Sequence, residues 1–169
     1  MKLIPLSQNG TKQKGKHFAI VDDEDYEDLV RYRWSYSYGY AARSIKRNEG
    51  LKNQTIRMHR QLIKGLKDGE QIDHKDRDKL NNQKNNLRVC NQFENQRNTC
   101  SRKNSSSKYL GVHYYDRSKE NRTSGWKATL RVDNKQHYLG MFQVEEDAAK
   151  AYDKAAVKYF KEFASLNFK

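Results

Sequence analysis

The residues best suited to chemistry lie between Gln71 and Asn98, in the stretch QIDHKDRDKLNNQKNNLRVCNQFENQRN. Here one Asp-His pair, Asp73 and His74, precedes a series of asparagines. A metal-dependent nuclease needs oxygen ligands for the ion, a base for the attacking water and a group that holds that base. Asp73 offers a carboxylate oxygen, Asn side chains offer neutral ones, and neutral His74 can accept a proton. A further carboxamide can fix the imidazole tautomer. The pattern therefore indicates a nuclease centre with one Mg²⁺ or Mn²⁺ ion, and it makes a poor zinc site.

The same stretch resembles the HNH nuclease family, whose fold is a two-stranded hairpin followed by a helix around one metal ion. The resemblance rests on IDH (72–74), NNLR (85–88) and ENQRN (94–98). It implies that His74 activates the water, that Asn86 orients His74, and that Asn95 stands where a third histidine is usual. This His-Asn-Asn form is similar to phage homing endonucleases, which implies that Asp73 and Asn95 hold the metal ion.

Two local features bear on this assignment. Asn91 and Glu94 form an N-x-x-E capping box, which predicts a helix with Asn95 in its first turn, facing the hairpin. Asp73 and His74 are neighbours, and neighbours on a regular strand face opposite sides, so they serve one site only if the strand ends or bulges there. The alternative interpretation is a polar loop whose asparagines satisfy turns.

The N-terminal part predicts a small antiparallel sheet over residues 16–62. FAIV (18–21) has the composition of a strand. In YRWSYSYGY (32–40) aromatic residues occupy every even position, which is typical of a strand or hairpin with one aromatic face and a bend near Gly39.

A third expected strand, QTIRMHR (54–60), contains His59. A histidine at this place is common in nucleases that resemble this chain. Strand parity sets His59 opposite Ile56 and Met58, so we expect it at the surface or in a supporting position around the nuclease centre.

The acidic run DDEDYED (22–28) is open to two interpretations. A calcium loop needs alternating ligands, a central Gly and a distal Glu, and this run contains no Gly. A short helix that continues through Tyr32, capped by Asp22 or Asp23, explains the run better because acidic side chains stabilise a helix N-terminus. We therefore expect a helix here.

The segment TCSRKNSSS (99–107) has no large apolar residue and is basic, which is typical of a flexible linker. Beyond it, YLGVHYY (109–115), GWKATLRV (125–132) and KQHYLGMF (135–142) predict three antiparallel strands. Asp133-Asn134 is a turn signal between the last two strands. VEEDAAKAYDKAAVKYF (144–160) predicts a helix across one side of the sheet. Its expected inner face carries Ala148, Tyr152, Ala155 and Tyr159, with Ala149 and Ala156 beside them.

Strand parity gives this sheet two faces. The inner face carries Leu110, Val112, Trp126, Ala128, Leu130, Val132 and Leu139. The outer face has an aromatic, basic and polar mixture without an acid: His113, Tyr115, Lys127, Thr129, Arg131, Gln136 and Tyr138. Such a mixture fits a surface that contacts bases and phosphates, and the alternative is a solvated sheet face.

This half resembles the plant ethylene-response-factor, or APETALA-type, DNA-binding domain. The matching stretches are KYLGV, GWKATLRV, YLGMF, EEDAAKAYDKAA and LNF. In that family the three-stranded sheet lies in the DNA major groove. The resemblance implies base or phosphate contacts from His113, Tyr115, Thr129, Arg131, Gln136 and Tyr138. The family usually has arginine where this chain has Leu110, His113 and Tyr115, so the binding mode carries over but the sequence preference does not.

The composition agrees with a polyanionic partner. The formal net charge is +13, with a basic excess in both halves and 11 tyrosines. Cys90 and Cys100 form no CxxC pair, which argues against structural zinc and suits a reducing cytoplasm. No apolar run approaches the length of a membrane span, so we expect a soluble protein without a membrane partner.

The sequence therefore predicts an α+β protein in four parts: an N-terminal β-rich subdomain (1–62), an HNH motif (63–100), a basic flexible linker (101–107) and a DNA-binding domain (108–169). We expect a monomeric, site-specific endonuclease of the homing type that acts on double-stranded DNA and nicks one strand, in the cytoplasm of a phage-infected or bacterial cell. One alternative is a non-catalytic, sequence-specific DNA-binding regulator with a degenerate nuclease. Another is an RNA-binding protein whose Tyr115 and Tyr138 stack on bases.

Overall fold

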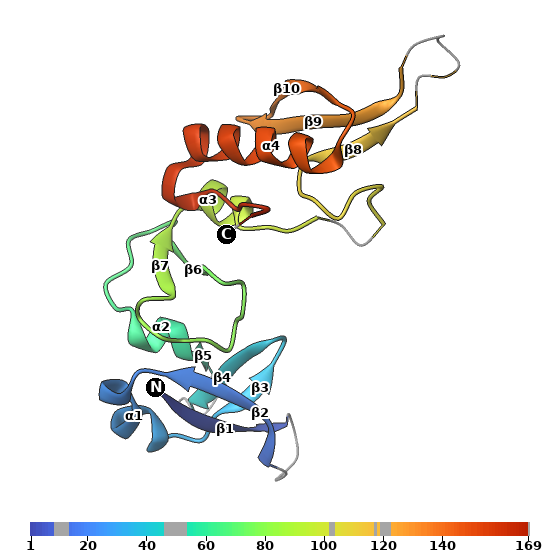
Figure 1. Cartoon of the computed structure of the whole chain (residues 1–169). Coiled ribbons are helices and arrows are strands. Elements are labelled where there is room, and N and C mark those ends of the chain that lie inside the picture. The colour runs from blue at the N-terminus through green and yellow to red at the C-terminus, as the bar shows by residue number, and fades with distance from the viewer. Residues whose placement is uncertain (9–13, 46–53, 102–103, 117, 119–122, 169) are drawn as a thin grey trace. The chain divides into compact units, whose positions relative to one another are not determined.

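A computed structural model describes the chain except for residues 9–13, 46–53, 102–103, 117, 119–122 and 169 (Figure 1). The fold is α+β, as predicted, with three small sheets and short helices. The chain divides into two compact units, Met1–Asn95 and Gln96–Lys169. Within the described residues, none of the helices is both long and apolar enough to span a bilayer.

The first unit begins with a five-stranded sheet in the order β2-β1-β3-β4-β5. Its strands are β1 (Lys2–Gln8), β2 (Lys14–Val21), β3 (Ser35–Ser37), β4 (Tyr40–Ile45) and β5 (Gln54–Arg57). β1 and β3 are parallel and the other pairs are antiparallel. The expected sheet over 16–62 was therefore incomplete, because it lacked β1, the strand that joins β2 to β3.

Two helices cover this sheet, and each corrects a detail of the prediction. Helix α1 (Asp23–Val30) occupies the acidic run, but the side chain of Asp22 does not cap it. Its carboxylate instead accepts hydrogen bonds from Gln83 Nε2 at 3.0 Å and Lys84 N at 2.8 Å. Helix α2 (Met58–Leu62) begins where a strand was expected to continue to residue 60.

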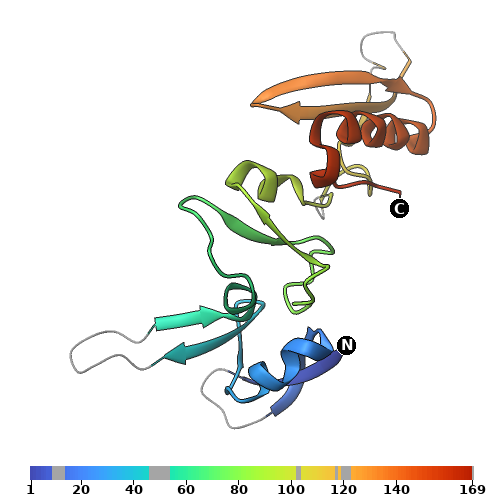
Figure 2. The same cartoon turned by 90° about the vertical axis from the view of Figure 1, so that its left-hand side faces the viewer.

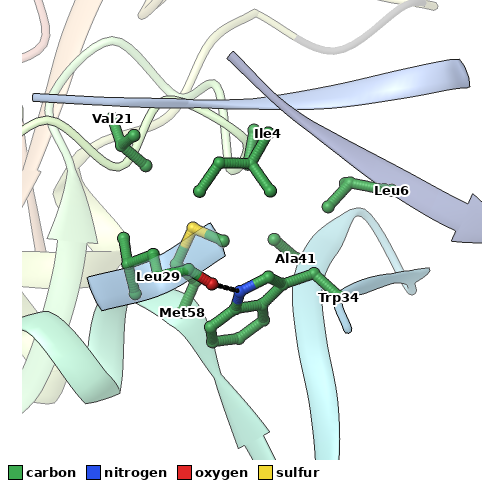
Figure 3. Close-up of a cluster of buried hydrophobic side chains, with 8 residues drawn as sticks. Ile4, Leu6, Val21, Leu29, Trp34, Ala41 and Met58 are labelled. Carbon is green, nitrogen blue, oxygen red and sulfur yellow. Dashed lines mark hydrogen bonds between the residues drawn. The ribbon is translucent and has the colours of Figure 1, made fainter. Parts of the chain in front are cut away.

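The core of this unit forms around Trp34, which is 1% exposed (Figure 3). Its indole Nε1 donates to Leu29 O at 2.8 Å, which joins the end of α1 to the sheet. The other buried members are Ile4, Leu6, Ala19, Val21, Leu29, Ala41 and Met58. The expected single aromatic face over 32–40 was wrong, because Tyr38 has φ +48° in the β3–β4 turn and is 91% exposed.

A second, two-stranded sheet follows, made of β6 (Gln71–His74) and β7 (Leu87–Cys90). Helix α3 (Gln92–Arg97) comes next, so the chain forms the ββα arrangement that its sequence predicted (Figure 1). The loop between the two strands is fastened to β2, since Ile20 N donates to Leu80 O at 2.9 Å and Asn82 N donates to Ile20 O at 2.8 Å.

The second unit is a three-stranded antiparallel sheet in the order β10-β9-β8, with α4 (Glu145–Phe160) along one face (Figure 2). The strands are β8 (Val112–Tyr115), β9 (Gly125–Val132) and β10 (Lys135–Phe142), and a short 3-10 helix, η2 (Lys161–Phe163), follows α4. Asp133 and Asn134 have φ of +47° and +63°, as a type I′ turn requires.

The alanines of α4 pack against the sheet, as predicted. The buried face of the helix includes Phe160 in place of the expected Tyr159. Ala148, Ala149, Tyr152, Ala156 and Phe160 are buried, whereas Tyr159 is 42% exposed. Close packing also demands Gly111, because a Cβ there would lie 2.1 Å from the Tyr152 ring. Its φ of +75° is a second reason for glycine at this position.

Part of the predicted linker is ordered within the second unit. Ser101 Oγ donates to Ser107 O at 2.9 Å, and Ser107 Oγ donates to Glu145 Oε1 at 2.6 Å. Ser165 Oγ donates to Thr99 O at 2.7 Å. The described residues of this segment thus pack within the second compact unit, which begins at Gln96.

Candidate active site

One face of the β6–β7 hairpin carries the acid of the expected centre. Residues paired across an antiparallel hairpin share a face, so Asp73 lies beside Arg88, its partner in the register. Arg88 donates to Asp73 Oδ2 from Nε at 2.9 Å and from Nη2 at 2.7 Å, and both side chains are largely buried. These two hydrogen bonds from one guanidinium fix the orientation of the Asp73 carboxylate. No role for Arg88 was predicted from the sequence, although antiparallel pairing of IDH with NNLR would place it beside Asp73.

Asn95 approaches the same face from helix α3. The capping box is present, with Glu94 N donating to Asn91 Oδ1 at 2.9 Å and Asn91 N donating to Glu94 Oε2 at 2.8 Å. Asn95 Nδ2 donates to Gln71 Oε1 at 2.6 Å, and Gln71 precedes Asp73 by two residues on β6. The amide nitrogen is thereby used, and the amide oxygen is the atom that Asn95 can offer to an ion.

His74 is the last residue of β6 and pairs in regular register with Leu87, so the strand continues without a bulge from Asp73 to His74. The peptide then turns, with Arg77 N donating to His74 O at 2.9 Å and Arg77 at φ +69°. The His74 side chain is only 5% exposed. Burial lowers the pKa of His74, because an imidazolium loses solvation there. The imidazole is therefore neutral at pH 7, the form that accepts a proton.

Two aromatic rings enclose His74. His59 meets it edge-on with ring centroids 5.1 Å apart, and the Tyr40 centroid lies 6.2 Å away. His59 is 4% exposed, and its burial lowers its pKa to about 3. Of the two positions expected for His59, the structure has the supporting one beside His74 and not the surface one, because residue 59 belongs to helix α2 and strand parity does not apply to it.

The Asn86 side chain supports the loop between β6 and β7. Its Nδ2 donates to Asp76 Oδ1 at 2.9 Å and to Asn81 O at 2.8 Å, and its Oδ1 accepts from Asp76 N at 3.0 Å. These contacts engage both ends of the Asn86 amide, and Asn86 O accepts from Lys75 N at 2.9 Å, directly after His74. That Asn86 orients His74 stays a prediction.

The carboxamide next to His74 is that of Asn82. This residue is 1% exposed, and its Nδ2 donates to Leu80 O at 2.9 Å. Its Oδ1 is buried without a hydrogen-bond partner in the described part of the chain. Asn82 is thus a second buried carboxamide of this loop, and nothing in the run NNQKNN distinguishes it by type from Asn86.

Hydrogen bonds within the loop stabilise it further. Burial would raise the pKa of Asp76, but hydrogen bonds from Asn81 and Asn86 outweigh that effect and lower it. Asp78 Oδ1 accepts from Leu80 N at 2.9 Å. These contacts hold the segment from Lys75 to Asn86 in one shape beside His74.

The ion that the motif implies would find a small set of hard donors. Asp73 supplies a carboxylate and Asn95 an amide oxygen, which suits a divalent cation that also keeps water and phosphate ligands. Within the described ranges, no three His, Cys, Asp or Glu side chains gather as an all-protein metal cage would need. Cys90 is a poor ligand, because burial raises the pKa of its thiol to about 11.

The outer face of the C-terminal sheet carries the residues expected to contact DNA. His113, Tyr115, Arg131, Gln136 and Tyr138 are exposed. Lys127 is half-buried, and its Nζ lies 5.5 Å from the Tyr115 ring centroid and 5.9 Å from that of Tyr138. Thr129 differs from the expectation, since only 6% of it is exposed at the centre of the sheet. Its neighbours cover it and leave it little surface for a contact.

Comparisons with known proteins agree with both resemblances. A family model described as HNH endonuclease matches residues 62–97. The AP2-like ethylene-responsive transcription factor TOE2 of Arabidopsis thaliana is 43% identical over 63 residues, which are 37% of this chain and 12% of that protein. The APETALA2-like protein 2 of Oryza sativa subsp. indica is 41% identical over 63 residues, 37% of this chain and 13% of that protein.

These matches are partial. The chain spans only about an eighth of the length of the curated relatives, and no solved structure matches it. Together they support nuclease activity, at a general level, for the ββα segment, and they suggest DNA binding through an APETALA-like segment.

Proposed function

We propose that this protein is a site-specific DNA endonuclease of the homing type, which nicks one strand of double-stranded DNA with one Mg²⁺ or Mn²⁺ ion. The observation that carries the proposal is the ββα motif with Asp73 and buried, neutral His74 at the end of β6 and Asn95 on α3. This motif lies within the segment that matches the HNH endonuclease model.

In the proposed reaction, His74 accepts a proton from water, and the resulting hydroxide attacks the phosphorus atom while the bond to the leaving oxygen breaks. The Tyr40 and His59 rings hold the imidazole in place, and Arg88 holds the Asp73 carboxylate. The ion, held by Asp73 and Asn95, would supply positive charge to the phosphate oxygens.

The proposed specificity comes from the C-terminal sheet. His113, Tyr115, Lys127, Arg131, Gln136 and Tyr138 form an acid-free face, and the similarity to APETALA-like proteins favours its use on DNA. Separate units for cutting and for recognition then act within one chain. A DNA-binding regulator without activity would share this second part and differ only in the first.

Incubation with supercoiled plasmid and Mg²⁺ or Mn²⁺ tests the proposal. The full-length protein should cleave, and EDTA should stop it. His74→Ala and Asp73→Ala should each lose at least 10²-fold in cleavage rate, of the order that a general base contributes, with DNA binding retained. Asn85→Ala is the matched control, because the Asn85 side chain is exposed and outside the proposed site. Binding without cleavage by the unaltered protein would favour the regulator instead.

A further inference from the structure

Two cations flank the ring that lies against His74. The Arg57 Cζ atom is 4.4 Å from the centroid of Tyr40, and Lys79 Nζ is 4.7 Å from the same centroid. The Tyr40 ring in turn contacts His59 and His74, with centroids 5.3 Å and 6.2 Å apart. Positive charge from two separate segments thus converges beside the proposed catalytic imidazole.

These cations are exposed, and neither has a carboxylate partner among the residues that the structure describes. Within the described residues, neither Arg57 nor Lys79 forms a salt bridge, whereas Lys84 pairs with Glu24 and Asp25, and Arg88 pairs with Asp73. Two like charges beside one ring repel each other, and an anion bound between them would offset that repulsion. Attraction to the ring face offsets part of that repulsion and holds both groups in place.

The backbone around each cation is fixed. Arg57 ends β5 and pairs with Ala42 on β4, the strand that Tyr40 begins. Lys79 precedes Leu80, whose carbonyl accepts from Ile20 N. A Cβ on Gly39 would lie 3.4 Å from Lys79 Cδ, so the lysine stem passes close to the β3–β4 turn. Both charges are therefore held at one location.

We propose that Arg57 and Lys79, supported by Tyr40, form a phosphate-binding site for the DNA strand that is cut. The inference rests on the proposed nuclease function, and it names residues that bind the backbone beside His74. An extended anion with a phosphate at each nucleotide meets both cations, and the exposure of both groups lets a duplex reach them. The Tyr40 ring keeps them from moving away in the absence of DNA.

The test measures DNA affinity in EDTA, where no cleavage occurs, by fluorescence anisotropy of a random-sequence duplex over a range of NaCl concentrations. Each phosphate contact contributes about 0.9 to the slope of log K against log salt. Arg57→Gln and Lys79→Gln should each reduce that slope by about this amount, and the double variant by about twice as much. Lys67→Gln makes the same charge change at an exposed position outside the cluster and should leave the slope unchanged.

Variants of Tyr40 distinguish a phosphate-binding site from a role in packing alone. Tyr40→Phe keeps the ring and should preserve the slope, whereas Tyr40→Leu should reduce it even though both cations remain. If Tyr40→Leu fails to fold, the two Gln variants decide the question alone. Slopes equal to that of the unaltered protein in both Gln variants would overturn the proposal.

The position of the contacted phosphate along the DNA is tested with duplexes in which one phosphate at a time, around the mapped cleavage site, is replaced by a neutral methylphosphonate. At the contacted phosphate, the neutral linkage should weaken binding of the unaltered protein but not weaken Arg57→Gln or Lys79→Gln further. If the protein substitution and the neutral linkage weaken binding additively at every linkage within two nucleotides of the cleavage site, the assigned location is contradicted. A protein that never cleaves would refute the nuclease function, while the salt slopes would still decide whether this site binds DNA.

Discussion

The Arg88 guanidinium donates two hydrogen bonds to a single oxygen of Asp73, from Nε at 2.9 Å and from Nη2 at 2.7 Å. Both side chains are largely buried, with 14% and 7% exposed. The pair therefore holds the carboxylate that is proposed to bind the ion in one orientation. Groups that orient a metal ligand in this way commonly influence affinity for the metal by 10- to 100-fold.

Arg88→Met should therefore weaken Mn²⁺ binding by about 10- to 100-fold. Arg88→Lys should recover only part of the affinity, because an ammonium lacks the planar guanidinium that donates from both Nε and Nη2. Isothermal titration with Mn²⁺ measures the effect without DNA. Arg60→Met, an exposed change on helix α2, serves as the control. Unchanged Mn²⁺ affinity in Arg88→Met would remove Arg88 from the site.

The pH dependence of cleavage follows from the burial of His74. Only neutral His74 accepts a proton from water, so activity should rise as pH rises through its pKa. Burial lowers that pKa, which moves the half-maximal rate below pH 6.5, the ordinary value for histidine. Single-turnover nicking at saturating metal between pH 4.5 and 8 measures it. A half-maximal rate above pH 6.5 would contradict this role, and His74→Ala should show no such step.

The stability of the first unit should also depend on pH, through His59. Its pKa is about 3 when folded and about 6.5 when unfolded, so between these values the unfolded chain binds more protons. The free energy of unfolding should therefore fall as pH drops from 6.5 toward 3, by roughly 1.4 kcal/mol per pH unit at most. Urea titrations at pH 7 and pH 5 measure the change. His59→Leu should reduce the pH dependence, and an equal slope in this variant would exclude His59 as its source.

The sequence predicted those elements whose pattern is local. Helix α4, strands β9 and β10, the turn at Asp133-Asn134 and the capping box at Asn91 follow from neighbouring residues and agree with the structure. Strand β1 was missed because its pairing with β2 and β3 depends on distant residues. Met58–Arg60 was assigned to a strand because helix α2 is only five residues long and carries too little helical periodicity.

The residues of the site could be predicted by type but not fully by contact. The sequence offered several asparagines in one loop, and its motif spacing indicated Asn86. The structure shows that the loop folds back on β2, where Asn82 is buried, and that the Asn86 amide is bound to Asp76 and Asn81. Tyr40 and His59 join the site from the N-terminal sheet and α2, and no local pattern around His74 specifies those long-range contacts.

The C-terminal sheet should separate base recognition from backbone binding. Arg131 is exposed on the outer face, paired in register with Gln136. If Arg131 contacts a base, Arg131→Ala should cost about 1–3 kcal/mol and relax the preference at one position of the target. Selection of binding sites from a randomised duplex pool measures this. Thr129→Val, a change at a 6% exposed position, is the control and should leave the preference unaltered. A loss spread evenly over all sequences would assign Arg131 to phosphate instead.

The final prediction is that one protein molecule nicks one strand. The chain contains a single set of Asp73, His74 and Asn95, and therefore one proposed metal centre. Cutting both strands requires phosphates of opposite polarity to reach a metal, which a symmetric dimer would achieve on a palindromic site. The two units of this chain differ in fold, so a monomer should bind an asymmetric target in one orientation. Supercoiled plasmid with the target should become open circle, with linear product late or absent, while light scattering during chromatography gives the mass of one 20.0 kDa chain. Linear DNA that forms as fast as the open circle, from a protein that elutes as a dimer, would contradict this mode of action.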